Sequence, residues 1–237
     1  MRILVINPNA SRAMSAVIQA QLEALAGPDV QVEVVNPDGA PPAIESALDE
    51  ARAIPPMLDV VAAAARRGAD AVVIACFSDP GLDAAREATP LPVVGIQEAS
   101  LYLAAQLGRR FSILTTLAHR VPARHRAARL ASLEERLASC PVLDLPVLDT
   151  VRDRERVLTL LLDRGRRAIA QDGAEVLILG CAGLGDLAPR VQQALGVPVV
   201  DPNAAGLKLA ETLVSLGLVP GQAARPAGQA PVAALLS

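Results

Sequence analysis

Two cysteines, Cys76 and Cys181, occupy matching places in the sequence, each at the end of a short run of apolar residues. These runs, AVVIA and EVLIL, are typical of buried strands in a parallel sheet. Ligands of open α/β sheets bind beyond the carboxyl ends of the strands, where both thiols are expected. Backbone N–H groups and the positive end of a following helix would favour the thiolate there. Each cysteine is therefore a candidate base or nucleophile.

Two thiols that face one cleft suit the inversion of a carbon acid's stereocentre without a cofactor. A base must remove the proton from one face of the carbon while an acid delivers a proton to the other face. A thiolate and a thiol can exchange these roles according to the enantiomer bound. The intermediate is an enolate, whose oxygen needs N–H donors. The candidate donors and substrate contacts lie in the turns after the cysteines: Phe77, Ser78 and Asp79, and Ala182 and Gly183.

Each candidate also has a purely structural interpretation. A single buried cysteine is more often a small hydrophobic residue than a catalyst. Two cysteines at equivalent points favour catalysis, whereas Cys140 lies elsewhere, before Pro141, and is given no role. Polar residues that follow two other strands are further candidate substrate ligands, although such residues also form ordinary turns and caps. They are Asn9, Ser11, Thr115 and Thr116.

The elements that must position these residues are short strands alternating with longer Ala/Leu/Arg segments of helical period. This alternation predicts βα units around parallel sheets. The predicted strands are Arg2–Ile6, Gln31–Val35, Ala71–Ala75, Pro92–Ile96, Phe111–Thr115, Val142–Leu145, Glu175–Leu179 and Val197–Asp201.

The two halves of the chain repeat one plan. RILVINPN matches FSILTTLA, GADAVVIAC matches GAEVLILGC, and LPVVGIQEA matches VPVVDPNAA. The spacing from Asn7 to Cys76 agrees within three residues with that from Thr115 to Cys181. We therefore predict an α/β fold with two domains related by a pseudo-twofold axis. Each domain is expected to hold a four-stranded parallel sheet flanked by helices, with the active site in the cleft between them.

Helix signals suggest where the domains begin and end. A crossover near 102–109 and a last helix over Ala204–Leu216 that returns to the first domain give 1–100 plus 204–219 as the first domain and 101–203 as the second. The Pro/Gly/Ala-rich segment 220–237 is expected to be a flexible tail.

Three local signals predict helix ends. Ser78, Asp79 and Pro80 predict a cap and first turn directly after Cys76, and Asp186 predicts a cap for a helix near Leu187–Leu195. Pro55 and Pro56 predict the end of one helix and the start of another.

Composition excludes several classes of function. Hydrophobic residues make up 52% of the 237 residues and charged residues 20%, which excludes a disordered chain. A net charge of −3 and an aromatic content of 1% argue against nucleic acid as a partner. The Arg-rich stretch 120–136, with Arg124, Arg126 and Arg129, has helical spacing and is interpreted as a solvated helix face.

The remaining signals exclude membrane, metal and nucleotide sites. No apolar run reaches the length of a membrane-spanning helix, and no basic and apolar leader opens the sequence, so we expect a cytoplasmic protein without a membrane partner. The scattered cysteines and His119 and His125 have no metal-ligand spacing, so no metal is expected. The string GCAGLG is not GxGxxG and lies late in the chain, which disfavours a dinucleotide site.

Five motifs in order make the chain resemble the hydantoin racemase family, including its allantoin racemase branch, within the aspartate/glutamate racemase superfamily. They are NPN at 7–9, ACFSDPGLDAA around Cys76, GIQEAS at 95–100, FSILTT at 111–116 and LGCAGL around Cys181. The resemblance extends to about residue 218. It implies a cofactor-independent racemase in which Cys76 and Cys181 are the acid/base pair and neighbouring residues bind a hydantoin-like or allantoin-like small molecule. We also expect a homo-oligomer.

Related chemistries remain alternatives. Amino-acid racemases of the superfamily typically carry CNT and CTH where this chain has CFS and CAG. Arylmalonate decarboxylases keep only the second cysteine, and maleate isomerases use two, one of which attacks covalently. An alternative from another class is a non-catalytic sensor that binds a small molecule between two α/β domains.

Overall fold

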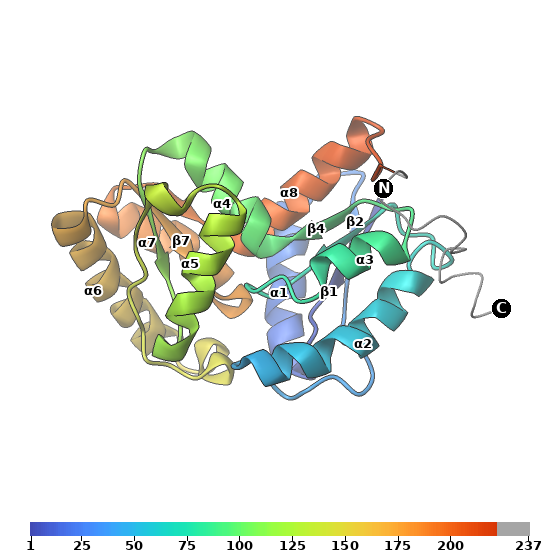
Figure 1. The fold of residues 1–237 in the computed structure, drawn as a ribbon, viewed down its shortest axis with the longest axis horizontal. Helices are drawn as coiled ribbons and strands as arrows, with labels where there is room; N and C mark the ends of the chain where they lie inside the picture. The colour runs from blue at the N-terminus through green and yellow to red at the C-terminus, as the bar shows by residue number, and fades with distance from the viewer. Residues whose placement is uncertain (222–237) are drawn as a thin grey trace.

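Two parallel β-sheets of four strands each, flanked by helices, make up the molecule (Figure 1). The computed structural model describes residues 1–221. The first sheet has the strand order β2-β1-β3-β4 and the second has β6-β5-β7-β8, so both halves use the same order. The predicted fold class is confirmed. The strands are β1 (Arg2–Ile6), β2 (Gln31–Val35), β3 (Ala71–Ile74), β4 (Val93–Gly95), β5 (Phe111–Leu114), β6 (Leu137–Ser139), β7 (Val176–Leu179) and β8 (Val199–Val200).

Helices connect and cover the strands. They are α1 (Arg12–Leu25), α2 (Ala47–Ala63), α3 (Leu82–Ala88), α4 (Ile96–Leu107), α5 (Val121–Leu130), α6 (Arg154–Asp172), α7 (Ala188–Leu195) and α8 (Pro202–Ser215). Helix α4 follows β4 and leads into the second sheet, and it contacts both β4 and β7. The last helix, α8, packs against α4, β3 and α1, which brings the end of the described chain back onto the first sheet (Figure 1). The predicted tail, 220–237, lies outside the described residues apart from its first two positions.

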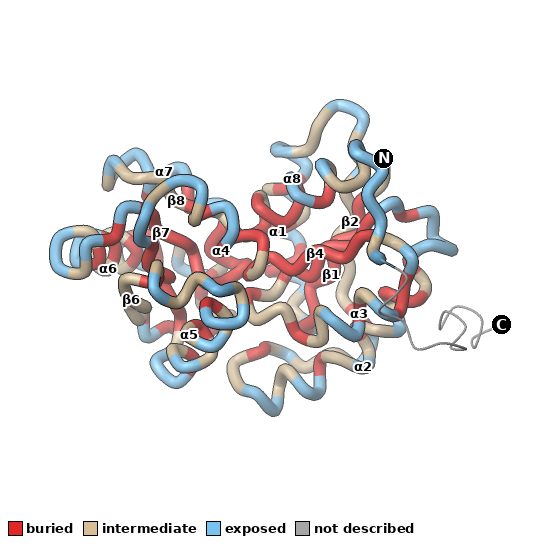
Figure 2. Tube along the Cα trace, turned by 45° about the horizontal axis from the view of Figure 1, so that its top comes forward, coloured by how far each residue is buried: buried red, intermediate tan, exposed pale blue. Residues whose placement is uncertain are grey.

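The core is continuous across the two halves. Strands β1, β3, β5 and β7 are buried along almost their whole length, as Figure 2 shows for β1 and β7. This burial explains their nearly unbroken apolar sequences. One hydrophobic cluster joins α1, β1 and β3 to β5, β7 and α6, and a smaller cluster covers the other face of the first sheet against α2 and α3. A shared core holds the two sheets, and hence their carboxyl ends, in a fixed relation.

The strand predicted at Val142–Leu145 is wrong. The edge strand of the second sheet is β6, over Leu137–Ser139, and Val142 forms only an isolated bridge with Thr115. Pro141 separates the two segments and has no backbone N–H to continue the ladder. The chain therefore breaks after Ser139 and pairs again beyond Pro141, where Leu143 N–H donates to the Thr115 carbonyl at 2.9 Å.

The break predicted in α2 is also wrong, because the helix runs through Pro55 and Pro56. These prolines leave the carbonyls of Ala51 and Arg52 without their usual helical donors. Both residues are exposed, so water can satisfy these carbonyls. The apolar face of α2 meanwhile stays packed against the first sheet, which compensates for the two lost hydrogen bonds.

Candidate active site

Both candidate cysteines line one cavity at the carboxyl ends of β3 and β7. The cavity holds about 460 Å³ of atom-free space, counting the part that is open to solvent. The chain reverses after each strand, and these turns place the two thiols on the same cavity from different sheets. Side chains from both halves form its walls: Asn9, Met14, Ile44, Glu45, Phe77, Ser78, Thr116, Leu117, Arg120, Arg124, Val147 and Ala182.

Cys76 lies in a tight turn after β3. Its carbonyl accepts hydrogen bonds from the N–H groups of Ser78 at 2.8 Å and Asp79 at 3.0 Å, and its sulfur lies 3.4 Å from the Ser78 hydroxyl. Burial raises the pKa of the thiol to about 12, the negative charge of an ionised Cys181 would raise it further, and the Ser78 hydroxyl lowers it. The thiol is therefore protonated at neutral pH, contrary to the expectation of a favoured thiolate.

That expectation relied on a helix directly after Cys76, and no helix begins there. Helix α3 starts only at Leu82, with Gly81 as its N-cap in the left-handed region at φ 63°. Asp79 also has a positive φ, 45°, which turns the chain before a helix can form. The N-terminal N–H groups of α3 are thus displaced along the chain from Cys76.

Cys181 has more polar partners. It is the N-cap of a short 3₁₀ helix, Ala182–Leu187, which precedes α7 in place of the cap predicted at Asp186. Burial raises the pKa of its thiol, whereas the Gly183 N–H, the positive charge of Arg124 and the Thr150 hydroxyl lower it. The turn after Cys181 therefore does direct a backbone donor at the sulfur.

Asp79 does not line the cavity. Its carboxylate accepts the N–H groups of Gln97 at 3.0 Å and Glu98 at 2.8 Å, in the first turn of α4. Gly95 makes room for it, because a Cβ at that position would lie 2.3 Å from the carboxylate. Burial raises the pKa of Asp79 to about 7, and the two N–H donors oppose that rise. Asp79 thus ties the Cys76 turn to the crossover helix.

The polar residues predicted after β1 and β5 have separate positions. Asn9 lines the cavity, and its Oδ1 accepts the Ser11 N–H at 2.8 Å. Ser11 is the N-cap of α1 and is not part of the cavity wall. Thr116 lines the cavity, whereas Thr115 is fully buried behind it and accepts a hydrogen bond from Arg124 Nε at 3.4 Å.

Phe77, directly after Cys76, forms an aromatic part of the wall. Its ring is buried, and the Arg124 guanidinium carbon lies 5.1 Å from the ring centroid. Its carbonyl accepts hydrogen bonds from Gln97 Nε2, at 2.9 Å, and from Arg124 Nη1. Gln97 and Arg124 therefore fix the position of Phe77.

Sequence reasoning missed Arg120 and Arg124. The solvated-face interpretation is correct for Arg126 and Arg129, which are exposed, but Arg120 and Arg124 are buried and line the cavity. A signal was present, because Arg120, Arg124 and Ala128 recur every four residues and so lie on one side of the helical segment. The buried Ala128 shows that this side faces inward.

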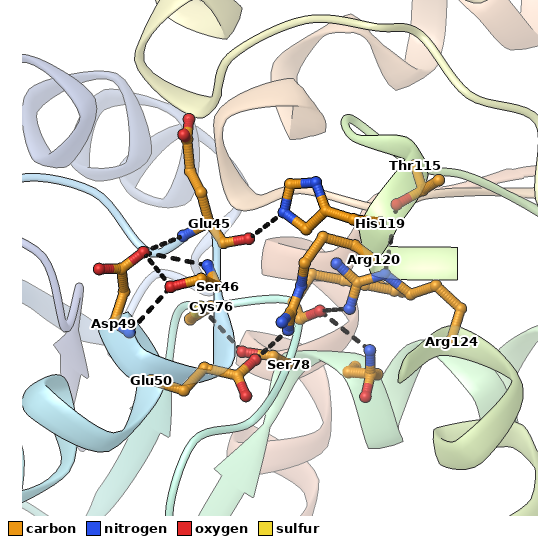
Figure 3. Close-up of polar contacts among 12 residues, drawn as sticks. Glu45, Ser46, Asp49, Glu50, Cys76, Ser78, Thr115, His119, Arg120 and Arg124 are labelled. Atoms are coloured by element: carbon orange, nitrogen blue, oxygen red, sulfur yellow. Dashed lines mark hydrogen bonds and ion pairs between the residues drawn. The ribbon is translucent and has the colours of Figure 1, made fainter. Parts of the chain in front are cut away.

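Contacts between the halves run along the cavity wall, to which Glu45, Arg120 and Val147 belong. The Glu45 carboxylate accepts the Val147 N–H at 2.7 Å. The Glu45 carbonyl lies 2.7 Å from His119 Nε2, as Figure 3 shows. One turn into α2, Glu50 pairs with Arg120. The loop before α2 thus joins the second half of the chain, a contact that sequence reasoning had no local pattern to find.

Two negative findings concern residues 1–221. No group of three or more His, Cys, Asp or Glu side chains in this part of the chain could hold a metal ion. None of its helices is long and apolar enough to cross a membrane.

A family model described as Asp/Glu/Hydantoin racemase matches residues 3–210, nearly the whole described chain. The chain belongs to this family. A hydantoin racemase from Pseudomonas sp. (strain NS671) is 42% identical over 217 residues, which cover 92% of this chain and 87% of that protein. The family places the chain among the racemases, which are isomerases.

Solved structures agree. An allantoin racemase from Klebsiella pneumoniae superposes with a TM-score of 0.92 at 38% identity, covering 97% of this chain and 95% of that one. An allantoin racemase from Pseudomonas fluorescens gives a TM-score of 0.88 at 32% identity, covering 97% and 99%. The similarity therefore extends over both sheets and the cavity between them.

Proposed function

We propose that this protein racemises C5 of 5-monosubstituted hydantoins or of allantoin, without a cofactor, by a two-cysteine mechanism. The observation that carries the proposal is that Cys76 and Cys181, from equivalent strand ends of two sheets, line one cavity. The relatives at 38% and 42% identity are an allantoin racemase and a hydantoin racemase, which supports this class of substrate.

The reaction begins when one thiol loses its proton. The thiolate removes the C5 proton, the electron pair of the C–H bond moves onto the adjacent carbonyl oxygen, and the neutral thiol on the other side protonates C5 from the opposite face. The two sulfurs exchange protonation states in each turnover. Because burial raises the pKa of both thiols, the doubly protonated form predominates at neutral pH and the reactive form is a minor species.

The turns after the cysteines supply donors for the enolate. The N–H groups of Ser78 and Asp79 are already bonded to the Cys76 carbonyl. The N–H groups of Phe77 and Ala182, each directly after a cysteine, are not engaged by other residues of the described chain. We assign these two N–H groups to the developing oxyanion, where fixed donors stabilise the transition state.

A second candidate is the isomerisation or racemisation of a small carboxylate. The observation that favours it is Arg124, a buried cation in the cavity wall that could bind a carboxylate. A covalent isomerase of this kind would leave an adduct on one cysteine that mass spectrometry detects. A non-catalytic sensor would leave every carbon acid unchanged.

The test is to incubate the L and D forms of several 5-substituted hydantoins, and of allantoin, separately with the protein and to follow optical rotation. Racemisation predicts that the signal of either enantiomer decays to zero while the mass stays unchanged. No change with any of these compounds would refute the substrate assignment, and a change in mass would refute racemisation.

Two further proposals concern the protein in its environment. We propose a homo-oligomer, supported by the exposed apolar side chains of α4, where Tyr102 is 47% and Leu107 51% exposed. Analytical ultracentrifugation tests it, and a purely monomeric species at micromolar concentration would contradict it. A cytoplasmic location is consistent with three free cysteines and can be tested by cell fractionation.

A further inference from the structure

One buried arginine of the cavity wall, Arg124, contacts no carboxylate of the described chain, although the charge of Glu50, which pairs with Arg120, acts on it without contact. Arg120 pairs with Glu50, and the thiols of Cys76 and Cys181 are neutral at neutral pH. Arg124 is 5% exposed, and its contacts within residues 1–221 are a carbonyl, a hydroxyl and an aromatic ring. A buried charge without a counter-charge is costly, so its retention in the cavity wall points to an anion that forms there.

The guanidinium is fixed by groups next to the reacting residues. Nη1 donates to the carbonyl of Phe77, the residue after Cys76, and Nε donates to Thr115, which follows β5. The ring of Phe77 lies against the guanidinium at 5.1 Å. Nη2 makes no hydrogen bond within the described residues, and Arg124 lines the cavity. Two anchors thus leave one edge of a planar cation available to a ligand.

Arg124 is within electrostatic range of both sulfurs. Its positive charge lowers the pKa of Cys76 and that of Cys181, although the two residues belong to different sheets. Glu50 affects Cys76, and Gly183, Thr150 and Arg154 affect Cys181. Arg124 acts on both of these thiols from the cavity wall that they share, and it also lowers the pKa of Cys140 outside the cavity. The arginine therefore differs from the local partners of each cysteine.

We propose that Arg124 is the shared counter-cation of the catalytic cycle, pairing in turn with the thiolate of one cysteine, the enolate oxygen and the thiolate of the other cysteine. The inference rests on the proposed two-cysteine racemisation and adds a catalytic residue to it. At each stage the site carries one negative charge. It lies first on the base, then, once the C5 proton has moved to that sulfur, on the substrate oxygen, and finally on the sulfur that has protonated C5. One fixed cation can therefore serve both directions of the reaction.

The test measures the thiols without substrate. In a Cys140→Ser background, which leaves the two cavity thiols as the reactive ones, alkylation of Cys76 and Cys181 is followed by mass spectrometry for the parent, Arg124→Met and Arg124→Lys. Arg126→Met is the matched control, because Arg126 is exposed on the same helix. Two reagents of similar size are compared, neutral iodoacetamide and anionic iodoacetate.

Loss of the cation is expected to slow iodoacetamide at both sulfurs by about tenfold or more at pH 8, because the pKa of each thiol rises by about one unit or more. The rate with iodoacetate is also divided by the rate with iodoacetamide, because this ratio does not depend on the thiolate fraction or on access to the sulfur. The ratio is expected to fall at both sulfurs, since the lost cation no longer attracts the anionic reagent. Arg124→Lys should lie between Arg124→Met and the parent, and Arg126→Met should match the parent.

Unchanged rates and ratios in a folded Arg124→Met protein, or a response of only one cysteine, would overturn the inference. Arg124→Gln serves if the Met variant does not fold, with the same expectation. These rates do not depend on the substrate. An unchanged thiol profile in an enzyme that racemises hydantoins therefore refutes the role of Arg124 alone, whereas failure on every hydantoin refutes the proposed function alone.

Discussion

Adding one methyl group at Gly183 tests how the turn after Cys181 is built. A Cβ at this position would lie 2.3 Å from Thr150 Oγ1 and 3.1 Å from Met14 Cε. Neither neighbour can move away easily, because both side chains are almost completely buried and the Thr150 hydroxyl donates to the Val147 carbonyl at 2.6 Å. The Gly183 carbonyl is itself held by Arg154 at 2.8 Å. In Gly183→Ala the turn must therefore shift.

Two effects set the magnitude. Overpacking a tightly packed site lowers the free energy of unfolding by about 1–3 kcal/mol. The shifted turn also withdraws the Gly183 N–H from the Cys181 sulfur, and a hydrogen bond to a charged group contributes about 1.5–3 kcal/mol. The thiolate of Cys181 is destabilised by that amount, so kcat/KM for racemisation is expected to fall about 10- to 100-fold.

The assay combines polarimetry with iodoacetamide alkylation of Cys181 and thermal unfolding. Gly27→Ala is the matched control, because a Cβ there meets only Val30 at 3.4 Å, an ordinary contact. Thr150→Ala combined with Gly183→Ala should restore much of the stability and part of the rate, because space returns and the N–H of residue 183 can again reach the sulfur, whereas the Thr150 hydroxyl stays absent. Wild-type rate and wild-type Cys181 alkylation in Gly183→Ala would refute the argument.

Three shorter predictions follow from the same structure. Burial raises the pKa of Cys76 to about 12 and also raises that of Cys181. Because the thiolate is the reactive form, kcat/KM should rise about tenfold per pH unit from pH 7 to 9. A plateau below pH 8 would contradict the pKa assignment. Asp79→Ala should lower the free energy of unfolding, measured by urea titration, by about 1–2 kcal/mol, because α4 loses the carboxylate that caps it. Asp79→Asn should lower it by less than half as much. Equal losses in the two variants would show that the cap is unimportant. Cys140→Ser should keep full activity in polarimetry, because Cys140 does not line the cavity; a loss of tenfold or more would assign it a role.

The fold was largely predictable from the sequence, for a physical reason. Strands covered by helices on both faces must be apolar throughout, so RILVI, AVVI, FSIL and VLIL identify the central strands directly. Failures occurred where tertiary contacts outweigh local signals. Pro55 and Pro56 remain inside α2 because the apolar face of this helix packs against the first sheet. Strand β6 lies at the edge of the second sheet and pairs only with β5, so its sequence need not be apolar throughout.

The sequence predicted those site residues that directly follow a strand and have a reactive side chain. It did not predict the residues that reach the cavity from distant helices. Cys76 and Cys181 were found because the internal repeat places them equivalently. Asp79 has the residue type of a substrate ligand, and only the folded chain shows that its carboxylate caps α4 instead. Arg124 reaches the cavity from a helix far along the chain, and the charge and helical spacing of its segment assigned it to a solvated helix face.

The central claim is that two cysteines act on opposite faces of C5, and deuterium exchange tests it most directly. Enantiomers have equal free energies in solution, so kcat/KM for racemisation must be equal in both directions, whereas exchange of the C5 proton with solvent has no such constraint. The account predicts that Cys76→Ser and Cys181→Ser each abolish racemisation and that, in D₂O, each still exchanges the C5 proton of one enantiomer, a different one for each variant. Racemisation at the wild-type rate by either variant, or exchange of the same enantiomer by both, would contradict the two-cysteine mechanism.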